Sequence, residues 1–146
     1  MNSPRRIAIV PALALVIALA LLVGGLVFAQ GSEEASAERI STAIQAGRLD
    51  AAIADARQAV AQFPKSSTLH QLLGAALFKK GANADARQAF RRAIELAPSV
   101  PQNHFNLALV ELSENKYSEA IESLETFVKL DPANARYVLA LIDRAI

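Results

Sequence analysis

The chain has 146 residues, 53% of them hydrophobic, with no cysteine and a formal net charge of +1. The length suits one compact domain with an appendage, and the absence of cysteine excludes disulfides and anchoring through a lipidated cysteine. The near balance of basic and acidic residues, with no aromatic platform beside the basic ones, argues against nucleic-acid binding. The mean hydropathy of +0.26 is high for a soluble domain, and the excess lies near the N-terminus.

The N-terminal apolar run, residues 7–29, contains no charged side chain. At about 1.5 Å per residue in a helix, the run is long enough to cross a hydrocarbon core of roughly 30 Å. Arg5 and Arg6 precede it and acidic residues follow it. The positive-inside rule therefore predicts that residues 1–6 stay in the cytoplasm and that the rest of the chain lies on the outer side of the membrane.

Two outcomes are open for this segment. The first is an uncleaved, single-pass signal anchor in a bacterial inner membrane, which would place the following domain in the periplasm. The second is a signal peptide cleaved near Ala29, which would release a secreted protein. The run is longer than the apolar core of about 7 to 15 residues that signal peptides use, which favours the anchor. Residues 30–34 then form a short linker or the start of the first helix.

The remainder of the chain, residues 35–146, is predicted to be one repeat domain. Small and turn-forming residues return every 34 positions, which divides the chain into the units 33–66, 67–100 and 101–134. The positions that show this period are Gly47, Gly81 and Asn115; Ala52, Ala86 and Ala120; Ala59, Ala93 and Phe127; and Pro64, Pro98 and Pro132.

Each unit is expected to form two helices joined by a tight turn. In the second unit two apolar stripes at helical spacing flank Gly81, and Pro98 ends the second helix. Asp50 is predicted to be an N-cap, and Pro101 to lie in a first helical turn. A pair this short cannot bury its own apolar face, so the units must stack. The expected helices cover about residues 35–46, 50–62, 68–80, 84–96, 102–114, 118–130 and 135–145, the last one capping the array.

This pattern resembles the tetratricopeptide repeat (TPR) family. The resemblance rests on Gly74, Leu77, Gly81, Ala86, Phe90, Ala93 and Pro98, which match the family pattern in the second unit. It implies an all-α, helix-turn-helix solenoid of three repeats plus a C-terminal capping helix, following the N-terminal transmembrane helix. In the first unit Ser36, Arg39 and Ala43 replace large apolar residues of the family pattern, and in the third Glu111 stands where the family has Tyr.

Residues that could carry catalysis or bind a metal are scarce. His70 and His104 are one repeat apart, but no acidic residue at a suitable spacing completes a ligand set. The chain contains no phosphate-binding loop and no metalloprotease motif. The sequence therefore predicts a protein that is not an enzyme, with no catalytic residue, no metal and no cofactor.

The resemblance implies that the first helices of successive repeats line a concave groove for an extended peptide or a helix of a protein partner. The first unit would contribute Ala37, Ser41 and Ile44, which leaves no cations for clamping a terminal carboxylate. Phe78 and Leu112 have an alternative role in packing between helices. The candidate partner-binding residues are Gln71, Ala75, Phe78, Lys79, Gln102, Phe105, Asn106, Leu109 and Leu112.

Three functions remain as hypotheses. The first is a non-catalytic, membrane-tethered adaptor or scaffold that binds a partner protein during assembly or biogenesis of an envelope complex. The second is a structural protein that self-associates through opposite charge, because residues 67–100 carry five basic and two acidic residues whereas residues 101–134 carry two basic and six acidic ones. The third is a non-catalytic subunit of an envelope enzyme complex.

Overall fold

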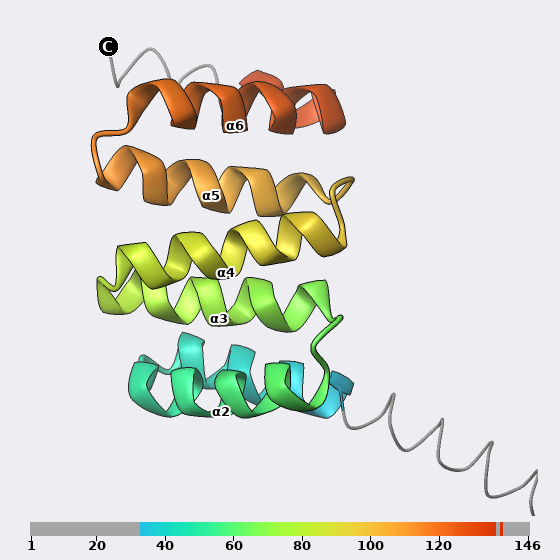
Figure 1. The fold of residues 1–146 in the computed structure, drawn as a ribbon, viewed down its shortest axis with the longest axis vertical. Helices are drawn as coiled ribbons and strands as arrows, with labels where there is room; N and C mark the ends of the chain where they lie inside the picture. Colours follow the sequence, from blue (N-terminus) through green and yellow to red (C-terminus); the bar gives the residue numbers. More distant parts are fainter. Residues whose placement is uncertain (1–32, 137, 139–146) are drawn as a thin grey trace, which may run out of the picture. The chain divides into compact units, whose positions relative to one another are not determined.

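The computed structural model describes residues 33–136 and 138, and no β-strand occurs among them. The first described helix covers residues 33–45. The labelled elements that follow in Figure 1 are α2 (Leu49–Gln62), α3 (Ser67–Lys80), α4 (Asn83–Leu96), α5 (Pro101–Ser113), α6 (Tyr117–Leu130) and the 3-10 turn η1 (Pro132–Asn134). The segments predicted as cytoplasmic N-terminus and transmembrane anchor, residues 1–6 and 7–29, lie outside the described residues.

The helix boundaries follow the sequence expectations closely, with local corrections at the N-termini. Asp50 is not an N-cap, because α2 begins one residue before it and the capping position is Arg48. Asp50 lies instead in the first turn, where its charge still favours the positive end of the helix dipole. Ser66 is the N-cap of α3, and its hydroxyl accepts a hydrogen bond from the Leu69 N–H at 3.2 Å. Pro101 occupies the first turn of α5, as expected.

The turn within each repeat uses a residue in the left-handed backbone region. Gly47 has φ of 72°, Gly81 has φ of 85° and Asn115 has φ of 59°. Glycine enters this region without steric cost, and asparagine tolerates it better than most residues. The 34-residue spacing of these three positions therefore reflects one backbone conformation used three times.

Helices that are neighbours in sequence contact one another, so the array is a stack of antiparallel pairs (Figure 1). The alanines that recur every 34 positions are in the core, with Ala52, Ala86 and Ala120 each 0% exposed. A methyl group at these positions lets the two helix backbones of a pair approach closely. The helix pairing inferred from the repeat pattern is thus confirmed.

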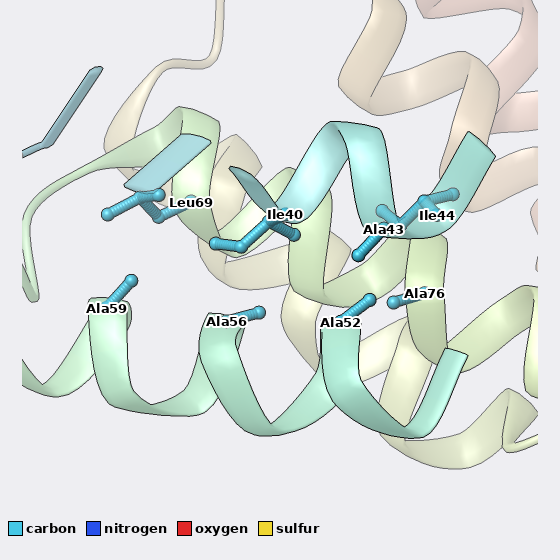
Figure 2. Close-up of a cluster of buried hydrophobic side chains, with 8 residues drawn as sticks. All are labelled: Ile40, Ala43, Ile44, Ala52, Ala56, Ala59, Leu69 and Ala76. Carbon is cyan, nitrogen blue, oxygen red and sulfur yellow. The ribbon is translucent and has the colours of Figure 1, made fainter. Parts of the chain in front are cut away.

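The first repeat packs well although its first helix carries small residues. Figure 2 shows Ile40 and Ala43 facing Ala52 and Ala56 of α2, and all four are buried. Ile44 joins the same cluster and is 8% exposed. The prediction that Ile44 lies in the groove is therefore wrong, because its side chain is buried in the core of the first repeat.

At the C-terminal end of the described chain, Val138 is fully buried against Ala108, Leu124 and Phe127. Ala135, Arg136 and Val138 are helical and lie at the start of the range predicted for the capping helix. Residue 137 and residues 139–145, the rest of the range predicted for the capping helix, lie outside the described residues. Across the part of the chain that the structure describes, no helix has the length and apolar character needed to cross a membrane.

Candidate functional site

The nine candidate partner-binding residues lie on two helices. Four are on α3 and five are on α5, the first helices of the second and third repeats, and these two helices contact each other directly as well as through α4. None of the nine is fully buried: Lys79 and Gln102 are exposed and the other seven are half-buried. We call this set the α3–α5 face.

The apolar members of the α3–α5 face differ in how firmly they belong to the core. Ala75 and Phe78 pack against the buried cluster that contains Leu77 and Phe90, so part of each side chain has a structural role. Leu109 and Leu112 are half-buried and contact none of the three buried clusters of the described chain. Both leucines therefore have apolar surface that a partner could cover.

The amide members of the face are paired with each other. The Gln102 side-chain nitrogen donates to the Asn106 side-chain oxygen at 2.8 Å, one helical turn away on α5. This bond uses one donor and one acceptor, which leaves the carbonyl of Gln102 and the amide nitrogen of Asn106 for other partners. An acceptor and a donor side by side are what the backbone of an extended peptide requires.

A hollow opens at one end of the α3–α5 face. Its volume is about 320 Å³, and the ring of Phe105 lies 5.3 Å from that of Phe127, centroid to centroid, in its wall. Gln102 and Phe105 belong to the predicted set. The lining residues that sequence reasoning missed are Pro101, Phe127, Asp131 and Asn134.

One of these missed residues had a signal in the sequence. Phe127 occupies the position of Ala59 and Ala93 in the earlier repeats, where a small side chain is the rule. A large aromatic ring at that position, in the last repeat, indicates a local change in packing. It provides the aromatic wall of the hollow beside Phe105.

Residues of the first repeat contribute less than the family resemblance implied. Ala37 and Ser41 are half-buried on the first described helix. Ala37 packs against the buried cluster of that repeat, which Ile44 also joins. The accessible apolar side chains that the sequence placed in the groove are therefore concentrated in the second and third repeats.

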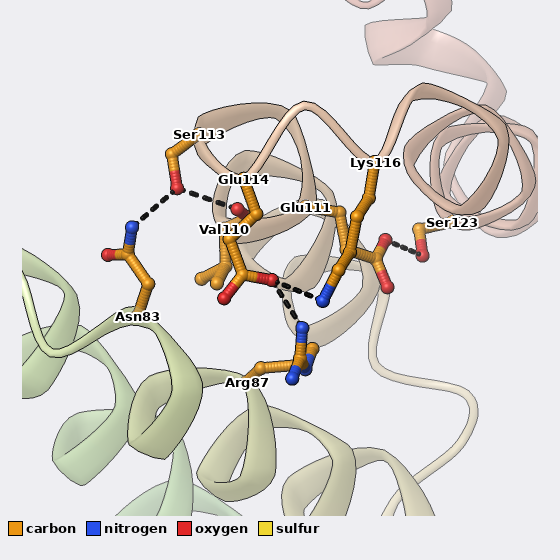
Figure 3. Close-up of polar contacts among 8 residues, drawn as sticks. All are labelled: Asn83, Arg87, Val110, Glu111, Ser113, Glu114, Lys116 and Ser123. Atoms are coloured by element: carbon orange, nitrogen blue, oxygen red, sulfur yellow. Dashed lines mark hydrogen bonds and ion pairs between the residues drawn. The ribbon is translucent and has the colours of Figure 1, made fainter.

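A second polar feature joins the second and third repeats on other faces of α4 and α5. Arg87 of α4 forms an ion pair with Glu114, and Lys116 binds the same carboxylate at 2.7 Å (Figure 3). Asn83 also donates to the Ser113 hydroxyl at 3.0 Å. The Arg87–Glu114 pair and the Asn83–Ser113 bond connect consecutive repeats, and the two side chains of the pair are partly shielded from water, so these contacts help to hold the repeats in register.

Beside this network lies a buried carboxyl group. Glu111 of α5 is 2% exposed and accepts a hydrogen bond from the Ser123 hydroxyl at 2.8 Å (Figure 3). Burial raises the pKa of the Glu111 carboxyl above its ordinary value, although the Ser123 hydrogen bond and the nearby Arg91 oppose that rise. In the second repeat the same two positions hold Leu77 and Ala89. The carboxyl group and its hydroxyl partner thus replace an apolar pair together.

The two histidines have the same structural role. Each ring donates from Nε2 to the carbonyl six residues earlier: His70 to Pro64 at 3.2 Å, and His104 to Pro98 at 2.9 Å. They tie the start of each repeat to the proline that ends the preceding one. Within the described ranges, no three His, Cys, Asp or Glu side chains are grouped as metal ligands.

Comparison with known families agrees with this architecture. One tetratricopeptide repeat model matches residues 38–101, and a second matches residues 101–134. Together they cover the described helices of all three repeats apart from the first turn. The chain belongs to the tetratricopeptide repeat proteins.

Two curated relatives are similar over part of the chain. Superkiller complex protein 3 of Mus musculus is 30% identical over 87 residues, which is 60% of this chain and 6% of that protein. The peroxisomal targeting signal receptor of Eremothecium gossypii is 34% identical over 74 residues, which is 51% of this chain and 13% of the receptor. The chain thus spans only a small part of the length of these relatives.

Among solved structures, the first TPR domain of Spaghetti (RPAP3) bound to the HSP90 peptide SRMEEVD superposes with a TM-score of 0.73. The alignment covers 77% of this chain and 89% of that domain, at 18% sequence identity. At this identity the similarity establishes the fold alone.

Proposed function

We propose that this chain is a non-catalytic adaptor that holds a segment of a partner protein on the α3–α5 face. The observation that carries the proposal is the surface of that face: nine residues predicted from the repeat register all retain solvent-accessible area, and two of them line a hollow of about 320 Å³. The RPAP3 structure, a TPR domain with a bound peptide, supports the same use of the fold here.

The chemistry of the face suggests an apolar segment in an extended conformation. Leu109 and Leu112 would contact apolar side chains of the partner, and the hollow beside Phe105 would receive one larger side chain. The free carbonyl of Gln102 and the free amide of Asn106 would bond to its backbone. Lys79 is the one charged residue of this set, so binding through the face should depend only weakly on salt.

A site-specific photocrosslinking experiment tests this location. We expect a photoreactive amino acid at Leu109 of the full chain to crosslink to a partner in cells, and the same group at the exposed Ala61 of α2 to give little product. Phe105→Ala should weaken the Leu109 crosslink while the helical circular dichroism of the purified chain is unchanged. Equal crosslinking from Leu109 and Ala61, or no effect of Phe105→Ala, would argue against the α3–α5 face as the binding site.

We further propose that residues 7–29 tether this adaptor to a bacterial inner membrane, with the repeats on the outer side, where it serves the assembly of an envelope complex. The support is the uncharged run and the flanking charge asymmetry. A role as a non-catalytic subunit of an envelope enzyme complex would use the same surface.

The tether is tested by fractionation. We expect the full chain to stay with membranes after an alkaline carbonate wash, and a variant lacking residues 7–29 to be in the soluble fraction. The intact mass of the mature protein gives its N-terminus directly. A mature chain that begins at Gln30 and is soluble would contradict the anchor and establish cleavage near Ala29.

A further inference from the structure

Two hollows recur one repeat apart on faces that the α3–α5 face does not include. The first, of about 760 Å³, is lined by residues of α2, α3 and α4; the second, of about 400 Å³, is lined by residues of α4, α5 and α6. They are equivalent positions of the repeat, because His70 and Leu73 in the first correspond to His104 and Leu107 in the second. No member of the α3–α5 face lines either one.

The two hollows carry opposite charge. The first is lined by four arginines and two acidic residues. The second is lined by one arginine and four glutamates. The difference arises at equivalent positions, since Gln88 and Arg92 of the second repeat become Glu122 and Thr126 in the third. We call the first one the basic hollow.

Two of the four arginines that line the basic hollow, Arg57 and Arg92, form only exposed ion pairs within the chain, whereas Arg87 is half-buried and paired with Glu114. Arg57 lies 3.9 Å from Asp85 and both side chains are more than half exposed, and Arg92 pairs with Glu95 on the surface of α4. Exposed ion pairs of this kind contribute little to stability and exchange readily for other partners. Below these arginines, Leu73 and Leu77 give the basic hollow an apolar floor.

An exposed part of α6, which includes Glu122 from the second hollow, complements the basic hollow in charge. Glu122 and Glu125 are exposed there, Glu125 lies 3.9 Å from Lys129 in an exposed pair, and Ile121 beside them is 39% exposed. Ile121 and Glu125, four residues apart, lie along one ridge of the helix, and Glu122 lies beside this ridge, three residues before Glu125. A ridge of side chains fits the channel between two neighbouring helices, as in ordinary helix packing.

We infer that the basic hollow of one molecule receives the α6 ridge of a second copy of this chain. Ile121 would rest on Leu73 and Leu77, and Glu122 and Glu125 would meet Arg57 and Arg92. The basic hollow is formed by α2, α3 and α4 whereas the ridge lies on α6, so the two surfaces are different parts of the chain, and the contact is head-to-tail and can extend from copy to copy. It leaves the α3–α5 face of every copy open, so an assembly would offer several binding sites to one partner.

The test uses two charge-reversed forms of the full chain, purified in detergent and studied by sedimentation velocity. One form carries Arg57→Glu and Arg92→Glu, and the other carries Glu122→Lys and Glu125→Lys. We expect the wild-type chain to associate with increasing concentration at low salt and to dissociate in high salt. Each reversed form alone should associate at least about tenfold more weakly, because like charges would face each other.

An equal mixture of the two reversed forms should associate again. The first form retains the acidic ridge, the second retains the basic hollow, and the two together rebuild the wild-type contact. The control form, Arg48→Glu with Lys65→Glu, has the same change in net charge as the first reversed form, at exposed sites outside both hollows, and should associate like the wild type. All forms keep residues 7–29, so association through that segment would survive every reversal.

Three results would overturn the inference. The first is a wild-type chain that stays monomeric at low salt over the full concentration range. The second is unchanged association of either reversed form. The third is a mixture that stays as dissociated as its components. None of these results changes the crosslinking expected at Leu109, so the adaptor function is tested independently of the self-association.

Discussion

Replacing Phe90 by alanine should lower the free energy of unfolding by about 3 to 5 kcal/mol, the cost of emptying a large buried aromatic site. Phe90 is 1% exposed and belongs to the buried cluster that joins the second and third repeats. A domain of this size has a total stability of about 5 to 15 kcal/mol, so the loss is a large share of it. Urea unfolding of the purified chain followed by circular dichroism measures the change.

Gly74 provides the second half of this test. A methyl group at Gly74 would lie 2.7 Å from the Phe90 ring, closer than real side chains approach. Gly74→Ala should therefore cost about 1 to 3 kcal/mol in the wild-type chain through overpacking. In the Phe90→Ala background the ring is gone, and the same change should stabilise by about 0.5 to 1 kcal/mol because alanine favours helix over glycine. An equal cost in both backgrounds would show that the two residues do not constrain each other.

Replacing Ser123 by alanine should cost about 1.5 to 3 kcal/mol at neutral pH, because Glu111 would lose the hydrogen bond that its buried carboxylate accepts. Adding Glu111→Leu to this variant copies the Leu77 and Ala89 pair of the second repeat. The double variant should recover the lost stability, since an apolar pair of suitable volume needs no hydrogen bond. A double variant less stable than Ser123→Ala alone would show that the carboxylate is needed for packing.

The Glu111 carboxyl group also makes the stability of the folded chain depend on pH, and the direction of this dependence can be predicted. Burial raises the pKa of Glu111 above 4.5, its value in the unfolded chain, with Glu119 acting in the same direction and Arg91 and Arg87 opposing it. The folded state then binds the proton more tightly than the unfolded state, so the contribution of Glu111 to stability increases as the pH falls through the folded-state pKa. This contribution becomes constant once the pH is below the pKa of Glu111 in the unfolded chain.

Glu111→Gln isolates this contribution, because glutamine keeps an oxygen that can accept from Ser123 but does not titrate. The wild-type chain should gain stability relative to Glu111→Gln as the pH is lowered from neutral towards 4.5. Unfolding curves of both proteins at several pH values measure the difference, which cancels the titration of the other carboxylates. A difference that is flat with pH would mean that Glu111 titrates alike in the folded and unfolded chains.

The repeat architecture was predictable from the sequence because its causes are local. A residue in the left-handed region at Gly47, Gly81 and Asn115, and a small residue at each helix crossing, are needed wherever two helices turn back on each other. These requirements are the same in every repeat, so the residues that meet them recur at the period of the repeat. The identity of the α3–α5 face follows from the same register, although its role as a binding surface is still a prediction.

Features that depend on contacts between neighbouring repeats could not be predicted from the sequence in this way. The repeat register predicts Ile44 in the groove, but its side chain is buried in the core with Ala43 and Ala52 instead. The hollow beside Phe105 requires the ring of Phe127 from the last helix and the chain turn at Asp131. Those contacts join residues more than 20 positions apart, and no periodicity within one helix records them.

By itself, the sequence determined the number of repeats, the place of their turns and the charge of each unit, because each depends on residues within one helix pair. Only the tertiary structure decided which charged side chains form ion pairs with each other. Arg87 is bound to Glu114 of the next repeat, whereas Arg57 and Arg92 remain at the surface around an apolar floor. Electrostatic interactions fall with distance and with exposure to water, so the placement of a charge decides its effect, and placement follows from packing between repeats.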